Sequence, residues 1–211
     1  MTDEIVTAEK LLQAEAVKLS PTSPFTWASG WKSPIYCDNR KLLSLPFTRD
    51  YIKSELANLV FETFPGADLI AGVATAGIAW GAMVADQLKL PFIYVRPKPK
   101  EHGLGNQIEG FFTAGQKAVV IEDLVSTGKS SLQVVDVLRK AGVEVLGMTA
   151  IFTYQFAAAT EAFKKEQVPL YALTNYPSLL RLALQKGRID QKEEAVLLNW
   201  SIDPANWSGV N

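Results

Sequence analysis

The sequence predicts an α/β fold in which a central, mostly parallel sheet is flanked by helices. The first observation is that short apolar runs alternate with amphipathic helical segments between residues 69 and 166. This alternation implies βαβ units, and so a parallel sheet that is covered on both faces. The second observation is that 211 residues, 48% of them hydrophobic, suffice for a substantial core without a linker. We therefore expect one domain over residues 1–211.

The N-terminal quarter is expected to contain two helices with an irregular segment between them. Apolar residues recur at helical spacing over residues 5–19, which predicts a half-buried helix that ends at Ser20. Residues 25–45 mix aromatic residues with turn formers and keep no sustained period, which indicates short strands and loops. Thr48 is a candidate N-cap for a second helix that ends near Pro65.

The alternating region is expected to supply the sheet. The predicted strands cover residues 69–73, 92–95, 118–122, 145–152 and 170–173, and the predicted helices cover residues 78–88, 130–141, 157–166 and the chain from Pro177 onward. Ligands of such sheets bind beyond the carboxyl ends of the strands. A site is therefore expected in the loops after Val73, Val95 and Glu122.

Composition and charge exclude several classes of function. The 21 basic and 22 acidic residues give a net charge of -1, which argues against a nucleic-acid binder, so any anion site must be local. The sequence contains no run of membrane-spanning length and no secretory signal, so no membrane partner is expected. Cys37 is the single cysteine, expected to be a small buried hydrophobe, and the cytoplasm is the expected compartment.

The strongest chemical signal is a strand that runs into two adjacent acids, then a hydroxyl-rich turn, then a helix. This stretch reads VVIEDLVSTGKS over residues 119–130. Main-chain N–H groups at such a turn and helix N-terminus favour a phosphate. Glu122 and Asp123 can accept hydrogen bonds from vicinal hydroxyls, which indicates a ribose phosphate with free 2- and 3-hydroxyls.

Two other interpretations of this stretch are less favoured. A strand that ends in solvated acids before an ordinary capped helix would be the better interpretation of a shorter match. A nucleotide-triphosphate loop also ends in Gly-Lys-Ser, as residues 128–130 do, but its first glycine would fall at Asp123. An anion at that position opposes a triphosphate.

A basic, glycine-rich stretch follows the strand that ends at Val95. Residues 96–110 read RPKPKEHGLGNQIEG and are expected to form a mobile loop. Cations on such a loop can close over a pyrophosphate, neutralise the charge that develops as it leaves, and exclude water. Alone, a histidine and lysines in a loop indicate only a solvated surface. The phosphate motif elsewhere in the sequence favours the role of closing over a pyrophosphate.

Two further stretches complete the set. Residues 72–77 read GVATAG, a turn of small residues whose main-chain amides can approach another phosphate group. Residues 25–40 read FTWASGWKSPIYCDNR, an irregular aromatic segment that either plugs one end of the sheet or contacts a planar base.

In their order along the chain, these four stretches resemble the orotate phosphoribosyltransferases, which are type I phosphoribosyltransferases. Residues 119–130 are similar to the phosphoribosyl pyrophosphate motif, residues 96–110 to the flexible catalytic loop, residues 72–77 to the pyrophosphate loop, and residues 25–40 to the hood over the base. The resemblance implies the type I phosphoribosyltransferase fold, with a small N-terminal hood over about residues 20–45.

The resemblance also implies residue roles. The expected catalytic residues are Lys100, His102 and Asp123. The residues expected to bind phosphoribosyl pyrophosphate are Arg96, Lys100, His102, Glu122, Asp123, Leu124, Val125, Ser126, Thr127, Gly128, Lys129, Ser130, Thr75 and Ala76. Those expected at orotate are Ile35, Tyr36 and Ser126. Mg²⁺ is the implied cofactor, held mainly through the substrate and without direct side-chain ligands.

The chain departs from the family pattern at several positions. Many members have a lysine where Pro97 stands, and Lys98 follows it without an assigned role. Ala76 replaces a lysine of some members and offers only its main chain. Tyr154 stands where many members have the arginine that binds the carboxylate of orotate, so Ser126 and main-chain amides are the remaining candidates for that contact.

The implied reaction joins a ring nitrogen of orotate to carbon 1 of the sugar and releases pyrophosphate, giving orotidine 5-phosphate for pyrimidine (UMP) synthesis. Catalysis of this kind needs positioning, Mg²⁺ and the cationic loop more than a nucleophile. Two alternatives stay open: another purine or pyrimidine phosphoribosyltransferase, and a non-catalytic regulator that senses phosphoribosyl pyrophosphate. The resemblance further implies a homodimer whose loop, with Lys100 and His102, completes the site of the opposite subunit.

Overall fold

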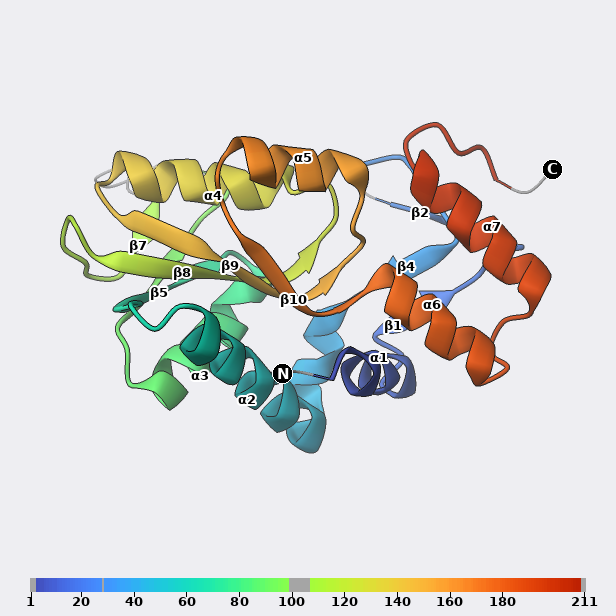
Figure 1. Cartoon of the computed structure of the whole chain (residues 1–211), viewed down its shortest axis with the longest axis horizontal. Helices are drawn as coiled ribbons and strands as arrows, with labels where there is room; N and C mark the ends of the chain where they lie inside the picture. Colours follow the sequence, from blue (N-terminus) through green and yellow to red (C-terminus); the bar gives the residue numbers. More distant parts are fainter. Residues whose placement is uncertain (1–2, 28, 99–106, 210–211) are drawn as a thin grey trace.

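The computed structural model describes residues 3–27, 29–98 and 107–209, and its centre is a six-stranded sheet in the order β10-β9-β8-β5-β6-β7 (Figure 1). The strands are β5 (Leu69–Val73), β6 (Phe92–Val95), β7 (Ile108–Glu109), β8 (Lys117–Val125), β9 (Glu144–Thr153) and β10 (Leu170–Asn175). All neighbouring strands are parallel except β7, which is antiparallel to β6. The predicted α/β class with a mostly parallel sheet is confirmed.

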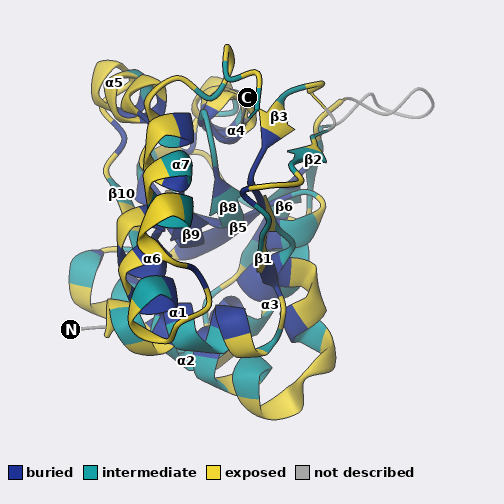
Figure 2. Ribbon diagram, turned by 90° about the vertical axis from the view of Figure 1, so that its right-hand side faces the viewer, coloured by how far each residue is buried: buried dark blue, intermediate teal, exposed yellow. Residues whose placement is uncertain are grey.

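Helices cover both faces of this sheet, which explains why its strands are continuous apolar runs. On one face lie α2 (Pro46–Thr63) and α3 (Ala76–Leu88), and on the other lie α4 (Lys129–Lys140) and α5 (Ala157–Lys165) (Figure 1). All five residues of β5 are buried. Figure 2 shows that burial is concentrated in the sheet and on the helix sides turned toward it.

The first helix is shorter than the sequence predicts. Helix α1 (Glu4–Gln13) is capped by Asp3, and the chain then turns through Glu15, whose φ is +49°. Strand β1 (Val17–Leu19) follows and pairs with β4 (Ile35–Cys37). The prediction of a helix up to residue 19 is wrong at its end, because pairing with a distant strand overrides a local helical pattern.

The second helix begins earlier than predicted. Leu45 is its N-cap, and Pro46 occupies the first helical position. Proline suits that position because its fixed φ is helical and its missing N–H would have no partner there. Thr48 therefore lies inside the first turn and is not the cap.

The N-terminal hood packs beside the C-terminal helices, at one end of the sheet (Figure 1). Its elements are β2 (Phe25–Thr26), β3 (Lys32–Ser33), β4 and the 3-10 helix η1 (Asn39–Ser44). Beside it lie α6 (Tyr176–Gln185) and α7 (Gln191–Ile202). The indole N–H of Trp200 in α7 donates to the carbonyl of Lys32 at 3.1 Å. Within the described part of the chain, no helix is long and apolar enough to cross a membrane.

Candidate active site

The order of the strands creates a crevice between β5 and β8. From β5 the chain moves outward to β6 and β7, then returns to the opposite side of β5 to form β8, β9 and β10. The loops after β5 and β8 therefore leave adjacent strands in opposite directions, at the edge where ligands of open α/β sheets bind. These two loops are residues 74–75 and 126–128, within two of the predicted stretches.

Close packing fixes the two loops. A Cβ atom on Gly77, in the first turn of α3, would lie 2.5 Å from the carbonyl oxygen of Ile121 in β8, so only glycine allows this approach. Gly128 is the N-cap of α4 with φ +76°, and a Cβ atom there would lie 2.6 Å from the ring of Phe163. Neither Thr75, the N-cap of α3, nor Gly128 caps its helix with a side chain. The first amides of both helices are thus oriented toward the crevice edge, where an anion can accept them.

The two predicted acids lie on β8 itself, since that strand continues to Val125 rather than ending at residue 122. Glu122 is 8% exposed, and its Oε2 atom has no hydrogen-bond partner among the described residues. Burial and then the charge of Asp123 raise the pKa of Glu122. Burial also raises the pKa of Asp123. Such carboxyls gain from a ligand that supplies hydroxyl donors.

A hood residue that the sequence analysis missed holds Asp123 in place. The side-chain amide of Asn39 donates to the main-chain carbonyl of Asp123 at 2.7 Å. Its neighbour Arg40 forms two bonds to Asp38, from Nε at 2.6 Å and from Nη2 at 3.0 Å. The charge of Arg40 lowers the pKa of Asp123 against the effect of burial. The only signal in the sequence was a polar Asp-Asn-Arg run directly after the aromatic stretch.

The base of the cationic stretch reaches the same crevice. Arg96 and Gln107 exchange bonds: the Arg96 N–H donates to the Gln107 carbonyl at 2.9 Å, and the Gln107 side chain donates to the Arg96 carbonyl at 2.8 Å. A small cavity of about 40 Å³ is lined by Val73, Ala74, Arg96, Pro97, Gln107, Ser130, Gln133 and Val134. Three of the predicted stretches therefore meet here. Lys100 and His102 lie outside the described residues, whereas Lys98 is described and exposed.

The hood places its two predicted orotate residues differently. Ile35 is fully buried, and its carbonyl accepts from the Trp27 indole at 3.1 Å and from the Ser33 hydroxyl at 2.8 Å. Its side chain is thus part of the core and unavailable to a ligand. Tyr36 is 39% exposed and keeps a ring surface that a planar base could contact. Of these two residues, only Tyr36 has a side chain that a ligand can reach.

Tyr154 lies in an aromatic cluster instead of a polar site. The rings within 5.1 to 5.8 Å of its ring belong to Trp27, Phe152, Phe156, Tyr176 and Trp200. Burial raises the pKa of its hydroxyl. Many family members have an arginine at the position of Tyr154. In this chain the Tyr154 ring instead contacts Trp27 of the hood and Trp200 of α7, and so connects these two parts.

Cys37 is a half-buried thiol beside the acids. Burial, and next the charges of Asp123 and Asp38, raise the pKa of this thiol. Because the thiolate is the reactive form, a raised pKa argues against a nucleophilic role. The expectation of a buried hydrophobe is met only in part, since the thiol is half-buried and donates to the Asn39 side chain at 3.4 Å.

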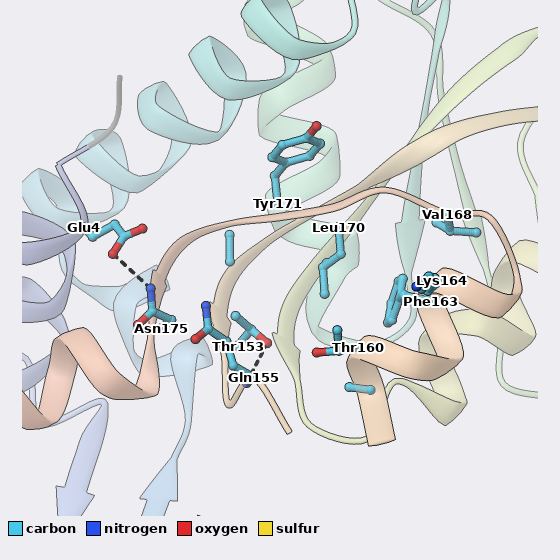
Figure 3. Close-up of a pocket in the computed structure, with 12 residues that line it drawn as sticks. Glu4, Thr153, Gln155, Thr160, Phe163, Lys164, Val168, Leu170, Tyr171 and Asn175 are labelled. Atoms are coloured by element: carbon cyan, nitrogen blue, oxygen red, sulfur yellow. Dashed lines mark hydrogen bonds between the residues drawn. The ribbon is translucent and has the colours of Figure 1, made fainter. Parts of the chain in front are cut away.

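A larger cavity of about 570 Å³ lies elsewhere, along β10 between α5 and the start of α1 (Figure 3). Four of its polar residues bond in two pairs: Asn175 donates to Glu4 at 2.9 Å, and the main chain of Gln155 donates to Thr153 at 3.1 Å. The carboxylate of Glu4 would repel a phosphate. We therefore assign the candidate site to the crevice and not to this larger cavity.

This chain is similar in sequence to a known family of proteins. The family model of the phosphoribosyl transferase domain matches residues 50–168. The orotate phosphoribosyltransferase of Bacteroides thetaiotaomicron is 56% identical over 200 residues, which make up 95% of this chain and 94% of that protein. That of Listeria innocua is 51% identical over 207 residues, 98% of this chain and 99% of that protein.

A solved structure agrees with these relatives. The orotate phosphoribosyltransferase from Aeropyrum pernix has a TM-score of 0.75 at 29% identity, and the match covers 87% of this chain and 99% of that one. The expected type I phosphoribosyltransferase fold is thereby confirmed. The strand-turn-helix crevice, the matched family model and the full-length relatives agree: this chain belongs to the phosphoribosyltransferase family, and within it to the orotate phosphoribosyltransferases.

Proposed function

We propose that this chain transfers ribose 5-phosphate from phosphoribosyl pyrophosphate to orotate, and that it does so in the crevice between β5 and β8. One observation carries the assignment of the site. The buried acid Glu122, the half-buried acid Asp123 and the open N-terminus of α4 belong to one strand-turn-helix unit, so they present hydroxyl acceptors and phosphate donors side by side.

Different parts of this strand-turn-helix unit bind different groups of the sugar phosphate. The turn and first helical residues, Ser126 to Ser130, hold the 5-phosphate through main-chain amides and hydroxyls. Glu122 and Asp123 accept bonds from the ribose hydroxyls. Val125 is fully buried, so any contact from it is made by its main chain. The side chain of Leu124 is half-buried against the core, and we likewise assign it a main-chain contact.

The pyrophosphate lies toward the other loops. The amides at Thr75 and Ala76 face it from the start of α3, and the positive charges of Arg96, Lys100 and His102 offset the charge that it gains as it leaves. The base lies under the hood, with Tyr36 at its face and Ser126 or neighbouring amides at its carboxylate. Lys98 is left without a role.

The reaction exchanges two bonds at carbon 1 of the sugar. A ring nitrogen of orotate supplies the electron pair of the new C–N bond, and the pair of the breaking C–O bond leaves with pyrophosphate. The acids offer oxygen donors, which Mg²⁺ prefers, so the site residues fit a Mg²⁺ ion that is held mainly through the substrate. When bound, Mg²⁺ supplies charge neutralisation for the pyrophosphate.

We further propose a twofold homodimer formed by α2 and α3. A surface pocket of about 640 Å³ is lined by Leu43, Arg49, Asp50, Lys53, Ala79, Ala82, Met83 and Asp86. Phe47, in the first turn of α2, is 93% exposed. A lining that combines apolar side chains with charges of both signs can pair with its own copy, as a twofold interface requires. Helix α3 also begins at the pyrophosphate loop, so a partner on this surface lies close to the crevice.

The test of the function is orotate consumption, followed by its ultraviolet absorbance, with phosphoribosyl pyrophosphate and Mg²⁺. Turnover that needs both substrates and releases pyrophosphate is the expected result. Turnover of hypoxanthine or uracil in place of orotate would reassign the substrate. Binding of phosphoribosyl pyrophosphate without turnover of any base would favour the regulator.

We place this reaction in the cytoplasm, in the synthesis of pyrimidine nucleotides. The single cysteine supports the compartment, because it leaves no internal disulfide to form. The relatives named orotate phosphoribosyltransferase support the pathway, since orotidine 5-phosphate is a pyrimidine nucleotide. Activity in the cytosolic fraction of a fractionated cell is the expected result.

A further inference from the structure

Asn39 connects two parts of the proposed site that are far apart in the sequence. It is the first residue of η1, two residues after β4 ends, and it is completely buried. Its amide nitrogen donates to the Asp123 carbonyl at 2.7 Å, across 84 residues of chain, and its amide oxygen accepts from the thiol of Cys37 at 3.4 Å. Both ends of the amide are therefore engaged, which fixes its orientation.

The bond fills a gap in the sheet. On one side of β8, pairing with β9 continues to Val125, but on the other side pairing with β5 stops at Ile121. Two residues later, at Asp123, no strand of residues 3–27, 29–98 or 107–209 pairs with β8 on the β5 side. Asn39 supplies a hydrogen bond at this place, and a buried carbonyl without one would be costly. The position of Asp123 thus depends on the hood.

The segment between Asn39 and the base is stiff. Strand β4 carries Tyr36 and pairs with β1, and the two bonds between Arg40 and Asp38 hold the start of η1. A shift of Tyr36 toward a bound base would therefore be passed along three residues to Asn39, and from there through its hydrogen bond to Asp123. A flexible connection would absorb such a shift.

We propose that Asn39 is a positioning residue that couples the orotate site to the ribose site, so that each ligand binds more tightly when the other is present. The inference rests on the proposed function. It assigns to Asn39 no contact with either ligand. Its effect is the placement of the main chain that carries the Asp123 carboxylate.

The test measures coupling without turnover. Orotate and ribose 5-phosphate cannot react, because the sugar has no pyrophosphate to lose. Calorimetric titration gives the dissociation constant of orotate with and without saturating ribose 5-phosphate, and the ratio of the two is the coupling factor. We expect a factor of about five or more for the wild type, falling to about one in Asn39→Leu. Titration in the reverse order must give the same factor.

A matched control separates coupling from general damage. Asn175 is also a buried amide that bridges distant parts of the chain, to Glu4 at 2.9 Å, but it lies outside the crevice. Asn175→Leu should lower the melting temperature and keep the coupling factor. Asn39→Ser, which adds no bulk, replaces Asn39→Leu if the latter does not fold, and the same loss of coupling is expected.

The possible results lead to separate conclusions. A wild-type factor of one, or an unchanged factor in the Asn39 variants, would overturn the inference while leaving the function intact. Failure of the wild type to consume orotate in the presence of phosphoribosyl pyrophosphate and Mg²⁺ would instead reject the proposed function, and the inference with it.

Discussion

Burial, with a smaller effect from the Asp38 charge, raises the pKa of Asp123, and this outweighs the bond with Glu122, a main-chain hydrogen bond and the Arg40 charge, which lower it. Removing its charge while keeping its shape isolates its proposed role as an acceptor from the ribose. We expect Asp123→Asn to fold normally and to lose about 1.5–3 kcal/mol of binding, or about 10- to 150-fold in kcat/KM for phosphoribosyl pyrophosphate.

The matched control for this variant is Asp136→Asn. Asp136 lies on α4 and forms an exposed pair with Lys140 at 2.7 Å, away from the acids. Steady-state kinetics should leave this control within about twofold of the wild type, because exposed ion pairs contribute little. Near-normal kinetics of Asp123→Asn would rule out the assigned role.

Glu122 is expected to make stability depend on pH. Burial and the charge of Asp123 raise the pKa of its carboxyl in the folded protein, whereas the unfolded chain keeps it at about 4.3. Between these values the folded state binds more protons than the unfolded state. The stability that the protonated carboxyl contributes is therefore complete below the lower pKa and is lost as pH rises through the folded-state pKa.

The comparison that isolates this effect is Glu122→Gln, which cannot titrate. Urea unfolding at several pH values gives the free energy of unfolding of each protein. The value for the variant minus that for the wild type should increase as the pH rises from about 4. A difference that stays constant across the pH series would show that burial does not raise the pKa of the Glu122 carboxyl.

Single elements show where sequence patterns are informative. The strands at residues 69–73 and 92–95 were predicted with the bounds that the structure gives, because each is a short apolar run between turn formers. The end of α1 was not, since β1 exists only by pairing with β4, about 18 residues away. A local sequence pattern predicts the bounds of an element when the element forms from its own residues. It does not predict them when the element forms only by pairing with a distant segment.

The candidate site divides in the same way. The acids, the turn and the start of α4 form one continuous stretch, so their proximity could be predicted from the sequence. The bond from Asn39 to Asp123 and the bond from Trp200 to Lys32 span 84 and 168 residues. No pattern within one segment indicates such contacts, because they depend on how the hood and α7 pack.

The turn before α4 is the element on whose geometry the proposed phosphate contact depends most. Gly128 has φ +76° and no room for a Cβ atom beside Phe163. Gly128→Ala should therefore lose about 2–4 kcal/mol of stability, from backbone strain and from overpacking together. The affinity for ribose 5-phosphate should fall as well, because the amides of the turn shift.

Gly187→Ala serves as the control for backbone strain. Gly187 has φ +64°, and nothing lies within 4 Å of an added Cβ atom. This variant should lose only about 1–2 kcal/mol and bind ribose 5-phosphate normally. Equal losses of stability and of affinity in both variants, measured by urea unfolding and calorimetry, would argue against a special role for Gly128.

For the whole molecule, the proposed α2–α3 interface can be tested by charge. Ala82 is an exposed residue of α3 and lines the surface pocket. Ala82→Arg places a long cation in the lining of the pocket, so we expect the dimer to dissociate in sedimentation experiments and the activity to fall. Gln87→Arg, on an exposed position of the same helix outside the pocket lining, should stay dimeric and active. A dimeric and active Ala82→Arg protein would place the interface elsewhere.

The role of the loop across this interface requires a test in which both subunits take part. Lys100 is proposed to complete the site of the partner, whereas Asp123 belongs to the site of its own subunit. Lys100→Ala and Asp123→Asn should each be nearly inactive alone, because every site in either dimer then lacks one group. Under the proposed arrangement, Lys100→Ala impairs the site of the partner subunit, whereas Asp123→Asn impairs the site of its own subunit. A mixed dimer therefore distinguishes a loop that crosses the interface from one that does not.

When the two variants are mixed in equal amounts and exchange subunits, about half of the dimers contain one of each. If the loop crosses the interface, one site of the mixed dimer collects both defects and the other site is intact. Orotate consumption should then recover to about a quarter of the wild-type value, because one site in two is intact in one dimer out of two. If the loop serves its own subunit, every site keeps one defect and no activity returns. No recovery, with exchange verified by mass-labelled subunits, would therefore exclude the crossed loop while leaving the dimer and the reaction in place.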